Sequence, residues 1–280
     1  MVAEFPVEKT VRARRSVRTY EERPLSKEDK EKITSYIAAL SNPFSVKVSI
    51  GLLEKKSAAN GEKLGTYGVI KGAGDYLGAA VTEGELSLEA LGYTFEKLIL
   101  YAASLGLGTC WLGGTFNRSG FSEAMGIKEN ELFPAISPIG YPQDKKRITD
   151  TLTRWIAKAD KRKGWEELFY QDDFSHPLTE TEAGDYAFPL EMLRLAPSAV
   201  NKQPWRVVKE KNNCHFYKTK NAEDTKTRID IQRVDVGIAA CHFHVAALEK
   251  KLPGEFKKLT NPGIQSPEQL QYIFSWVGEK

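Results

Sequence analysis

Apolar residues recur at helical spacing between Gly92 and Gly106. One helical face, at positions i, i+3, i+4, i+7 and i+8, carries Phe95, Leu98, Ile99, Ala102 and Ala103. This period of about 3.6 residues is typical of a helix with one buried face. The pattern therefore predicts a core helix in this segment.

A similar pattern returns 145 residues later, beginning at Gly237. Small, apolar and aromatic positions correspond without a gap over about 20 residues, as in an internal repeat. The matched pairs include Leu98 with Phe243, Leu100 with Val245, Ala102 with Ala247, Leu107 with Leu252 and Trp111 with Phe256. We interpret the run as a diverged duplication of the chain.

Two predicted strand entries support the repeat. Residues 42–46 align with residues 203–207, because each has a proline, an aromatic residue and a β-branched run that predicts a strand. The first copy then needs about 16 more residues before its helix, within the Gly-rich and charged stretch 54–76. We therefore divide the chain into a first half (1–156), a linker (157–184) and a shorter second half (185–280).

A compact basic cluster lies near the start of the chain, in the order Arg14, Arg15, Ser16, Val17 and Arg18. Arginine forms forked, charge-assisted hydrogen bonds to dianions, so the cluster is a candidate phosphate-binding site. The alternative is a solvated basic segment ahead of a helix predicted for residues 24–40. Tyr20, just after the cluster, is interpreted as a packing residue.

Two further segments have the composition of binding loops. Residues 106–114 contain four glycines directly after the core helix, where glycine allows left-handed backbone and close approach of a ligand. Residues 196–205 are rich in small and amide side chains, which can hydrogen-bond the edge of a planar polar ring. The alternatives are a helix-to-strand turn with Trp111 in the core, and a polar loop after a helix-ending Pro197.

These three segments resemble the flavin site of the FMN-dependent nitroreductase family, in which the motifs lie in one short chain and the site is built across a homodimer. The resemblance is closest to the tandem, internally duplicated nitroreductases. It implies an α+β fold, a nitroreductase-like fold duplicated into a pseudo-dimer within one chain, with long helices at the middle and a mixed sheet in each half. The first half keeps the arginines and the second keeps the Pro-Ser-x-x-Asn-x-Gln loop, so we expect one flavin per chain.

The resemblance also implies roles for individual residues. The FMN phosphate would be bound by Arg14, Arg15, Ser16 and Arg18, with Lys145 and Arg147 closing over it. The main-chain N–H groups opposite flavin N5 and O4 would be those of Leu112, Gly113 and Gly114. The pyrimidine edge would be approached by Pro197, Ser198, Ala199, Asn201 and Gln203, although structural bracing explains Asn201 and Gln203 equally well. Asn60 and Lys63 match family positions near the ribityl chain only weakly, and their roles stay open.

The implied activity is that of an FMN-dependent NAD(P)H oxidoreductase. Hydride would pass in a ping-pong reaction from NADH or NADPH through flavin N5 to a small aromatic, quinone or nitro-type acceptor, with no catalytic side chain. One alternative is a non-catalytic flavin-binding protein that serves as a sensor or store. A scaffold that has lost its site is a third reading, against which the retention of both motif halves argues.

Charge and composition limit the kinds of partner that the protein can bind. A net charge of +3, with basic and acidic residues interleaved, argues against nucleic acid as a partner. No apolar stretch approaches the roughly 20 residues of a membrane span, and the N-terminus lacks a signal-peptide layout. Three widely spaced cysteines indicate a reducing compartment, so we expect a cytoplasmic protein. The resemblance to the tandem nitroreductases implies a monomeric pseudo-dimer that could pair further. Cys241 and His244 could share a helix face, but we interpret them as core residues and expect no metal site.

Overall fold

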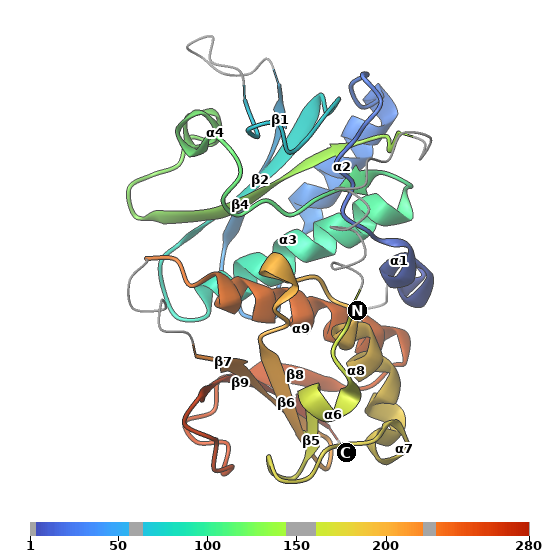
Figure 1. The fold of residues 1–280 in the computed structure, drawn as a ribbon, viewed down its shortest axis with the longest axis vertical. Helices are drawn as coiled ribbons and strands as arrows, with labels where there is room; N and C mark the ends of the chain where they lie inside the picture. The colour runs from blue at the N-terminus through green and yellow to red at the C-terminus, as the bar shows by residue number, and fades with distance from the viewer. Residues whose placement is uncertain (1–3, 56–63, 144–160, 221–227, 280) are drawn as a thin grey trace.

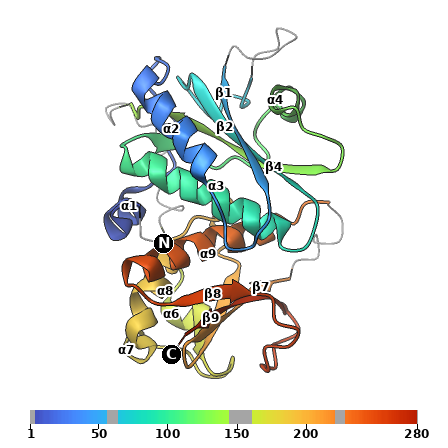
Figure 2. The same cartoon turned by 180° about the vertical axis from the view of Figure 1, so that it is seen from behind.

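The computed structural model describes residues 4–55, 64–143, 161–220 and 228–279. Two long helices run through the middle of the molecule, and a β-sheet lies on each side of this pair (Figure 1; Figure 2). The helices are α3 (Ser87–Ser104) and α9 (Ile231–Glu249). The largest apolar cluster runs from one sheet through the helix pair to the other sheet, and a smaller cluster packs against each sheet.

The first sheet has the strand order β1-β2-β4-β3, with every neighbouring pair antiparallel. Its strands are β1 (Val48–Glu54), β2 (Asp75–Thr82), β3 (Gly108–Thr109) and β4 (Glu131–Gly140). The central strand β2 is buried from Asp75 to Val81, because α3 covers one face and a second apolar cluster around Phe121 covers the other. This cluster lies beneath α4 (Arg118–Met125).

The second sheet has the order β5-β6-β7-β9-β8 and is antiparallel except for the parallel pair β5-β6. Its strands are β5 (Phe169–Gln171), β6 (Trp205–Glu210), β7 (Asn213–Thr219), β8 (Gly254–Lys257) and β9 (Leu270–Gly278). Without β5, its order repeats that of the first sheet: β6, β7, β8 and β9 stand where β1, β2, β3 and β4 stand. In both sets the central helix connects the second strand to the third.

The predicted helix is longer than its sequence pattern indicates and is buried on almost all sides. It begins at Ser87, and of the predicted buried face only Ala103 is half-exposed. The two helices touch through glycine: a Cβ on Gly92 would lie 2.1 Å from the Val234 carbonyl oxygen, and one on Gly237 would lie 2.1 Å from the Glu89 carbonyl oxygen. Both Gly92 and Gly237, and Glu89 and Val234, are 145 residues apart, so the two contacts exchange under the same offset that relates the sequences.

Short helices surround this framework. The helix predicted for residues 24–40 is α2 (Lys27–Ala39), which begins after Ser26 because the Ser26 side chain accepts a hydrogen bond from Asp29 N–H (3.1 Å). The others are α1 (Val7–Ala13), α6 (Trp165–Leu168), α7 (Glu180–Ala183), η2 (Gly184–Tyr186), α8 (Ala187–Arg194) and η3 (Ala199–Asn201). None of the helices in the described ranges has the length and apolar character needed to cross a membrane.

Two sequence predictions need correction. The predicted linker is structured over its described part, and β5 within it is an edge strand of the second sheet. The alignment of Pro43 with Pro204 is also wrong, because β1 begins at Val48 whereas β6 begins directly after Pro204. The position of the extra residues is confirmed: residues 55–74 join β1 to β2, and only residues 211–212 join β6 to β7.

Candidate functional site

The arginine cluster is an extended segment that lies along the first sheet. Helix α1 ends at Ala13, and the backbone of the next residue, Arg14, is already extended. Ser16 then forms a parallel bridge with Thr109, and Val17 N–H donates to the Thr109 carbonyl (2.8 Å). Tyr20 is buried, and its hydroxyl donates to the Val17 carbonyl (2.7 Å), which confirms it as a packing residue. The structure thus brings the basic cluster beside the glycine segment, although about 90 residues separate them in sequence.

Arg14 differs from its neighbour Arg15 in its burial. Arg15 is exposed, whereas the Arg14 side chain is only 7% exposed, and no hydrogen bond joins Arg14's guanidinium to the described part of the protein. Its Nε is fully enclosed. Burial raises the pKa of the nearby Cys110 thiol, and Arg18, Ser16 and Arg14 partly oppose this rise. A buried guanidinium without hydrogen-bond partners is costly unless a ligand supplies them.

The glycine segment leaves α3 through Gly106, which is left-handed (φ 79°). Leu112 then pairs with Ile136, its N–H donating to the Ile136 carbonyl (2.9 Å). The prediction that Leu112 N–H faces a flavin is therefore wrong, because that donor is already used in the sheet. Within the described ranges, the N–H groups of Gly113 and Gly114 have no partner, and a Cβ on Gly114 would meet nothing within 4 Å.

The loop after α8 is held in an uncommon backbone conformation. Val200, Asn201 and Gln203 all have positive φ (45°, 57° and 48°), which is a real cost for β-branched Val200. The Ser198 hydroxyl accepts a hydrogen bond from Gln203 N–H (2.8 Å), which closes the loop on itself. Pro197 precedes this turn and is half-buried.

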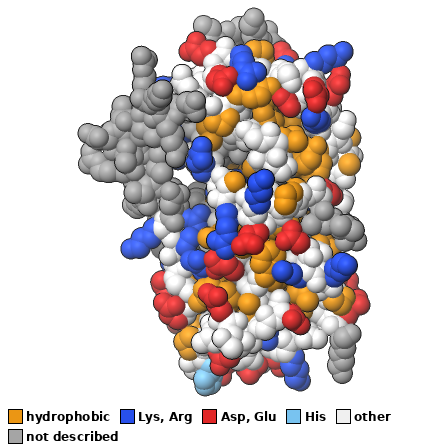
Figure 3. Space-filling model, turned by 90° about the vertical axis from the view of Figure 1, so that its right-hand side faces the viewer, with side chains coloured by type: hydrophobic (Ala, Val, Ile, Leu, Met, Phe, Trp, Pro, Cys, Tyr) orange, Lys and Arg blue, Asp and Glu red, His pale blue; other side chains and the backbone are white. Residues whose placement is uncertain are grey.

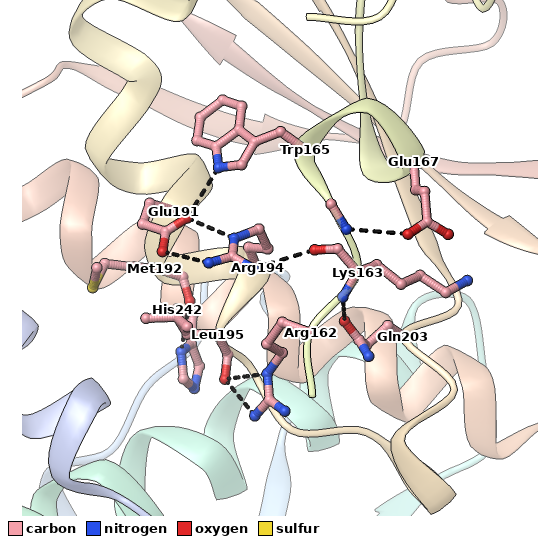
Figure 4. A network of polar contacts seen from close by, with 11 residues as sticks. Arg162, Lys163, Trp165, Glu167, Glu191, Met192, Arg194, Leu195, Gln203 and His242 are labelled. Carbon is pink, nitrogen blue, oxygen red and sulfur yellow. Dashed lines mark hydrogen bonds and ion pairs between the residues drawn. The ribbon is translucent and has the colours of Figure 1, made fainter. Parts of the chain in front are cut away.

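The amides of Asn201 and Gln203 bind other parts of the protein. Asn201 Nδ2 donates to the Lys161 carbonyl (2.7 Å), and Gln203 Oε1 accepts from Lys163 N–H (2.8 Å). Figure 4 shows how residues 162–167 are tied both to this loop and to α8, where Arg162 donates to the Leu195 carbonyl (3.0 Å). In this structure both amides act as braces, which is one of the two roles that the sequence left open.

Helix α9 brings the glycine segment and the loop together. Ala199 N–H donates to Oδ1 of Asp235 (2.9 Å), and a Cβ on Gly113 would lie 3.7 Å from Cδ1 of Ile231. Ile231 and Asp235 are four residues apart and therefore share one helix face. The two motifs thus lie against neighbouring turns of α9, one from each half of the chain.

Lys145, Arg147, Asn60 and Lys63 lie outside the described residues. The chain enters the range 144–160 next to the arginine segment, where Gln143 N–H donates to the Thr19 carbonyl (3.1 Å). It leaves that range at Lys161, next to Asn201. Figure 3 shows Lys and Arg side chains gathered near mid-height on this side of the molecule, with acidic side chains directly below them.

Two buried carboxylates at the site were missed by sequence reasoning. Glu96 on α3 is fully buried and lies 2.9 Å from His242, and Asp235 on α9 has one oxygen that is enclosed and unpartnered. Burial raises the pKa of Asp235 to about 7. The available signal was an acidic residue within a mainly apolar helix, because a carboxylate that becomes buried there must be paired or functional.

The cysteine and histidines of α9 are core residues, as predicted. Cys241, His242 and His244 are all buried, and the His244 ring bonds the Tyr93 hydroxyl (2.7 Å). Burial lowers the pKa of His244 to about 4, so it is neutral at pH 7. Among the described residues, no group of three His, Cys, Asp or Glu side chains is arranged to hold a metal ion.

Comparison with known proteins identifies the family. Residues 6–247 match the family model described as "Putative TM nitroreductase", and the chain belongs to this family. A protein of Archaeoglobus fulgidus named "Putative NADH dehydrogenase/NAD(P)H nitroreductase" is 28% identical over 177 residues, which cover 56% of this chain and 97% of that protein. The resemblance inferred from the sequence motifs is thereby confirmed.

A solved structure shows the same fold over nearly the whole chain. It is a nitroreductase-family protein from Thermotoga maritima, titled "putative nitroreductase", with a TM-score of 0.62 and 19% identity. The match covers 96% of this chain and 92% of that chain. The predicted α+β nitroreductase-like fold is confirmed at this level.

Proposed function

We propose that this protein is an FMN-dependent NAD(P)H oxidoreductase of the nitroreductase type, with one FMN bound between its two halves. The observation that carries the proposal is Arg14, whose buried guanidinium has no hydrogen-bond partner in the described structure. A phosphate dianion offers several acceptor oxygens to such a group. Ser16 and Arg18 lie on the same extended segment and can add a hydroxyl and a second positive charge.

The remaining residues of the site fit the rest of the cofactor. Gly113 and Gly114 offer two main-chain donors, and the open space at Gly114 allows a planar ring to approach the backbone closely. The loop from Pro197 to Gln203 lies against the neighbouring turn of α9, where Ala199 N–H donates to Asp235. We propose Lys145 and Arg147 as further phosphate ligands by resemblance to the family.

Bound FMN would supply two-electron transfer from NADH or NADPH to a small aromatic, quinone or nitro-type acceptor. The protein's own residues then have three tasks. The arginines neutralise the phosphate, the two glycines direct N–H donors at the point where negative charge develops, and the braced loop fixes the ring edge. The Archaeoglobus relative's name is that of an NAD(P)H nitroreductase, which supports this reading.

We also propose that the chain is an internally duplicated pseudo-dimer. The repeated strand order supports this, as do the helix contacts that exchange under an offset of 145 residues. In a two-fold interface each contact occurs twice with the partners exchanged, and these helix contacts have that form. The Archaeoglobus relative corresponds over almost its whole length to little more than half of this chain.

The test is to reconstitute the protein with FMN, quantify bound flavin per chain, and add NADH or NADPH anaerobically. We expect one flavin per chain, with absorbance that bleaches on reduction and returns in air. Failure to bind FMN would refute the proposal. Tight binding without bleaching by either nucleotide would identify a flavin-binding protein without this activity, and two flavins per chain would contradict the single-site architecture.

A further inference from the structure

Glu96 on α3 connects the three segments that meet at the candidate site. Its carboxylate is fully buried. Oxygen Oε2 accepts a hydrogen bond from the indole N–H of Trp111 (2.6 Å), within the glycine segment. Oxygen Oε1 lies 2.9 Å from Nε2 of His242 on α9 and 4.0 Å from Nε of Arg14. Each carboxylate oxygen is thus committed to a different part of the site.

The hydrogen bonds of His242 determine how many protons this cluster holds. Nδ1 lies 3.0 Å from the Met192 carbonyl oxygen, which can only accept, so Nδ1 must carry a hydrogen. In a neutral ring Nε2 would then be an acceptor facing a carboxylate oxygen, which is repulsive at 2.9 Å. One further proton therefore lies between His242 and Glu96, and the pair has no net charge.

The protonation of the Glu96–His242 pair determines whether the charge of Arg14 is cancelled. Since the proton shared with His242 already balances the carboxylate, Glu96 orients the guanidinium without cancelling its charge. We propose that Glu96 is a positioning residue for the FMN phosphate: it holds Arg14 through Oε1 and the glycine segment through Trp111. This inference rests on the function proposed above.

Glu96→Gln is the informative substitution because an amide has the same shape but only one acceptor oxygen. That oxygen cannot both accept from Trp111 and face Arg14. The amide nitrogen can still donate to His242, so the α3–α9 contact is kept. The variant should therefore lose the orientation of one partner while remaining folded.

Glu89→Gln is the matched control. Glu89 lies on the same helix, is also fully buried, and also pairs with an arginine, Arg233 (2.6 and 2.7 Å). Its partner Arg233 lies on α9, but no hydrogen bond or ion pair joins Glu89 to the arginine segment or the glycine segment among the described residues. The control therefore reproduces the loss of a buried α3 carboxylate without disturbing Arg14.

The experiment measures FMN and riboflavin dissociation constants for the wild-type protein and both variants. We expect Glu96→Gln to weaken FMN about tenfold and riboflavin about threefold or less, with the preference for FMN unchanged in Glu89→Gln. Equal weakening of both flavins, no change, or the same loss of preference in Glu89→Gln would overturn the role of Glu96. A wild-type protein without any preference for FMN would instead refute the proposed function.

A second measurement is made on the wild-type protein and needs no Glu96 variant. Inorganic phosphate is titrated into wild-type protein while the indole N–H signals of its five tryptophans are followed by NMR. Trp111→Phe assigns the Trp111 signal. We expect this signal to shift when phosphate binds Arg14, because Arg14 and Trp111 lie against the same carboxylate, and a signal that does not respond to saturating phosphate would refute the coupling.

Discussion

The segments that follow α3 and α9 differ although they leave equivalent helices. After α3, strand β3 has only two residues, and the chain continues into Gly113 and Gly114, whose N–H groups are unpaired within the described structure. After α9, strand β8 has four residues and pairs with β9 along its whole length. The same framework thus ends in a free glycine turn on one side and in a complete strand on the other.

The second segment is also closed by side chains. Lys258 and Leu259 stand 145 residues after Gly113 and Gly114. Lys258 Nζ donates to the Ile273 carbonyl (2.6 Å), and Leu259 N–H donates to the Tyr272 hydroxyl (3.1 Å). The N–H of Gly114 has no partner among the described residues, whereas the N–H of its counterpart Leu259 is used within the protein. A binding site at this position therefore depends on hydrogen bonds that the protein leaves unmade.

The largest effect is expected where the two halves are most alike. Gly92→Ala and Gly237→Ala each place a Cβ 2.1 Å from a backbone carbonyl oxygen, which forces α3 and α9 apart. Each should lower the free energy of unfolding by about 3 kcal/mol or more, measured by urea denaturation. Gly84→Ala, where a Cβ meets nothing within 4 Å, is the control. If either helix glycine tolerated alanine, the two-fold exchange of contacts would not hold the framework together.

Arg14→Ala tests the arginine cluster, which only the first half of the chain has. Removing the buried guanidinium should weaken FMN by about tenfold to a hundredfold and riboflavin far less, because the lost contact is to phosphate. Isothermal titration with both flavins measures this. Arg12→Ala is the control, because Arg12 is exposed and its guanidinium pairs with Glu8 one turn away (3.0 Å). Parallel losses for FMN and riboflavin would show that Arg14 supports the fold instead.

Asp235 marks a second difference between the helices, since Ala90 stands 145 residues before it. Burial raises the pKa of Asp235 to about 7, so between about pH 4 and 7 the folded state holds a proton that the unfolded state releases. The stability contributed by this group is present at low pH and is lost as pH rises toward 7. Asp235→Asn should therefore gain roughly 4 kcal/mol of unfolding free energy relative to wild type between pH 4 and 8.

Urea denaturation of wild type and Asp235→Asn at pH 4 and at pH 8 measures this change in unfolding free energy. A variant whose stability parallels that of the wild type across the range would mean that Asp235 does not titrate there.

The smallest effect is expected at Gly114, whose counterpart in the second half is Leu259. Gly114→Ala adds a Cβ into open space, so its unfolding free energy should stay within about 0.5 kcal/mol of wild type. If a flavin ring lies against this backbone, its affinity should fall about threefold to tenfold for FMN and riboflavin alike. Unchanged affinity for both would mean that the ring does not approach Gly114.

The sequence by itself determined the local elements and the repeat. Spacing within residues 92–106 located α3, the offset of 145 located α9, and the surplus of residues between β1 and β2 was assigned correctly. The helix positions follow from the periodicity of apolar residues, and the surplus follows from the number of residues between two predicted elements. Both can be read along the chain without knowledge of its packing. The arginine, glycine and loop motifs also identified the family, because each motif is a short run of consecutive residues.

Only the tertiary structure decided which polar groups have partners. Leu112 N–H was a candidate donor until β4 was seen to bind it, and β5 looked like linker because its partner β6 lies far along the chain. Arg14 and Arg15 are indistinguishable in sequence, yet only Arg14 turns inward toward Glu96. Hydrogen bonds between distant segments depend on how helices and sheets pack, and a short-range pattern contains no record of that packing.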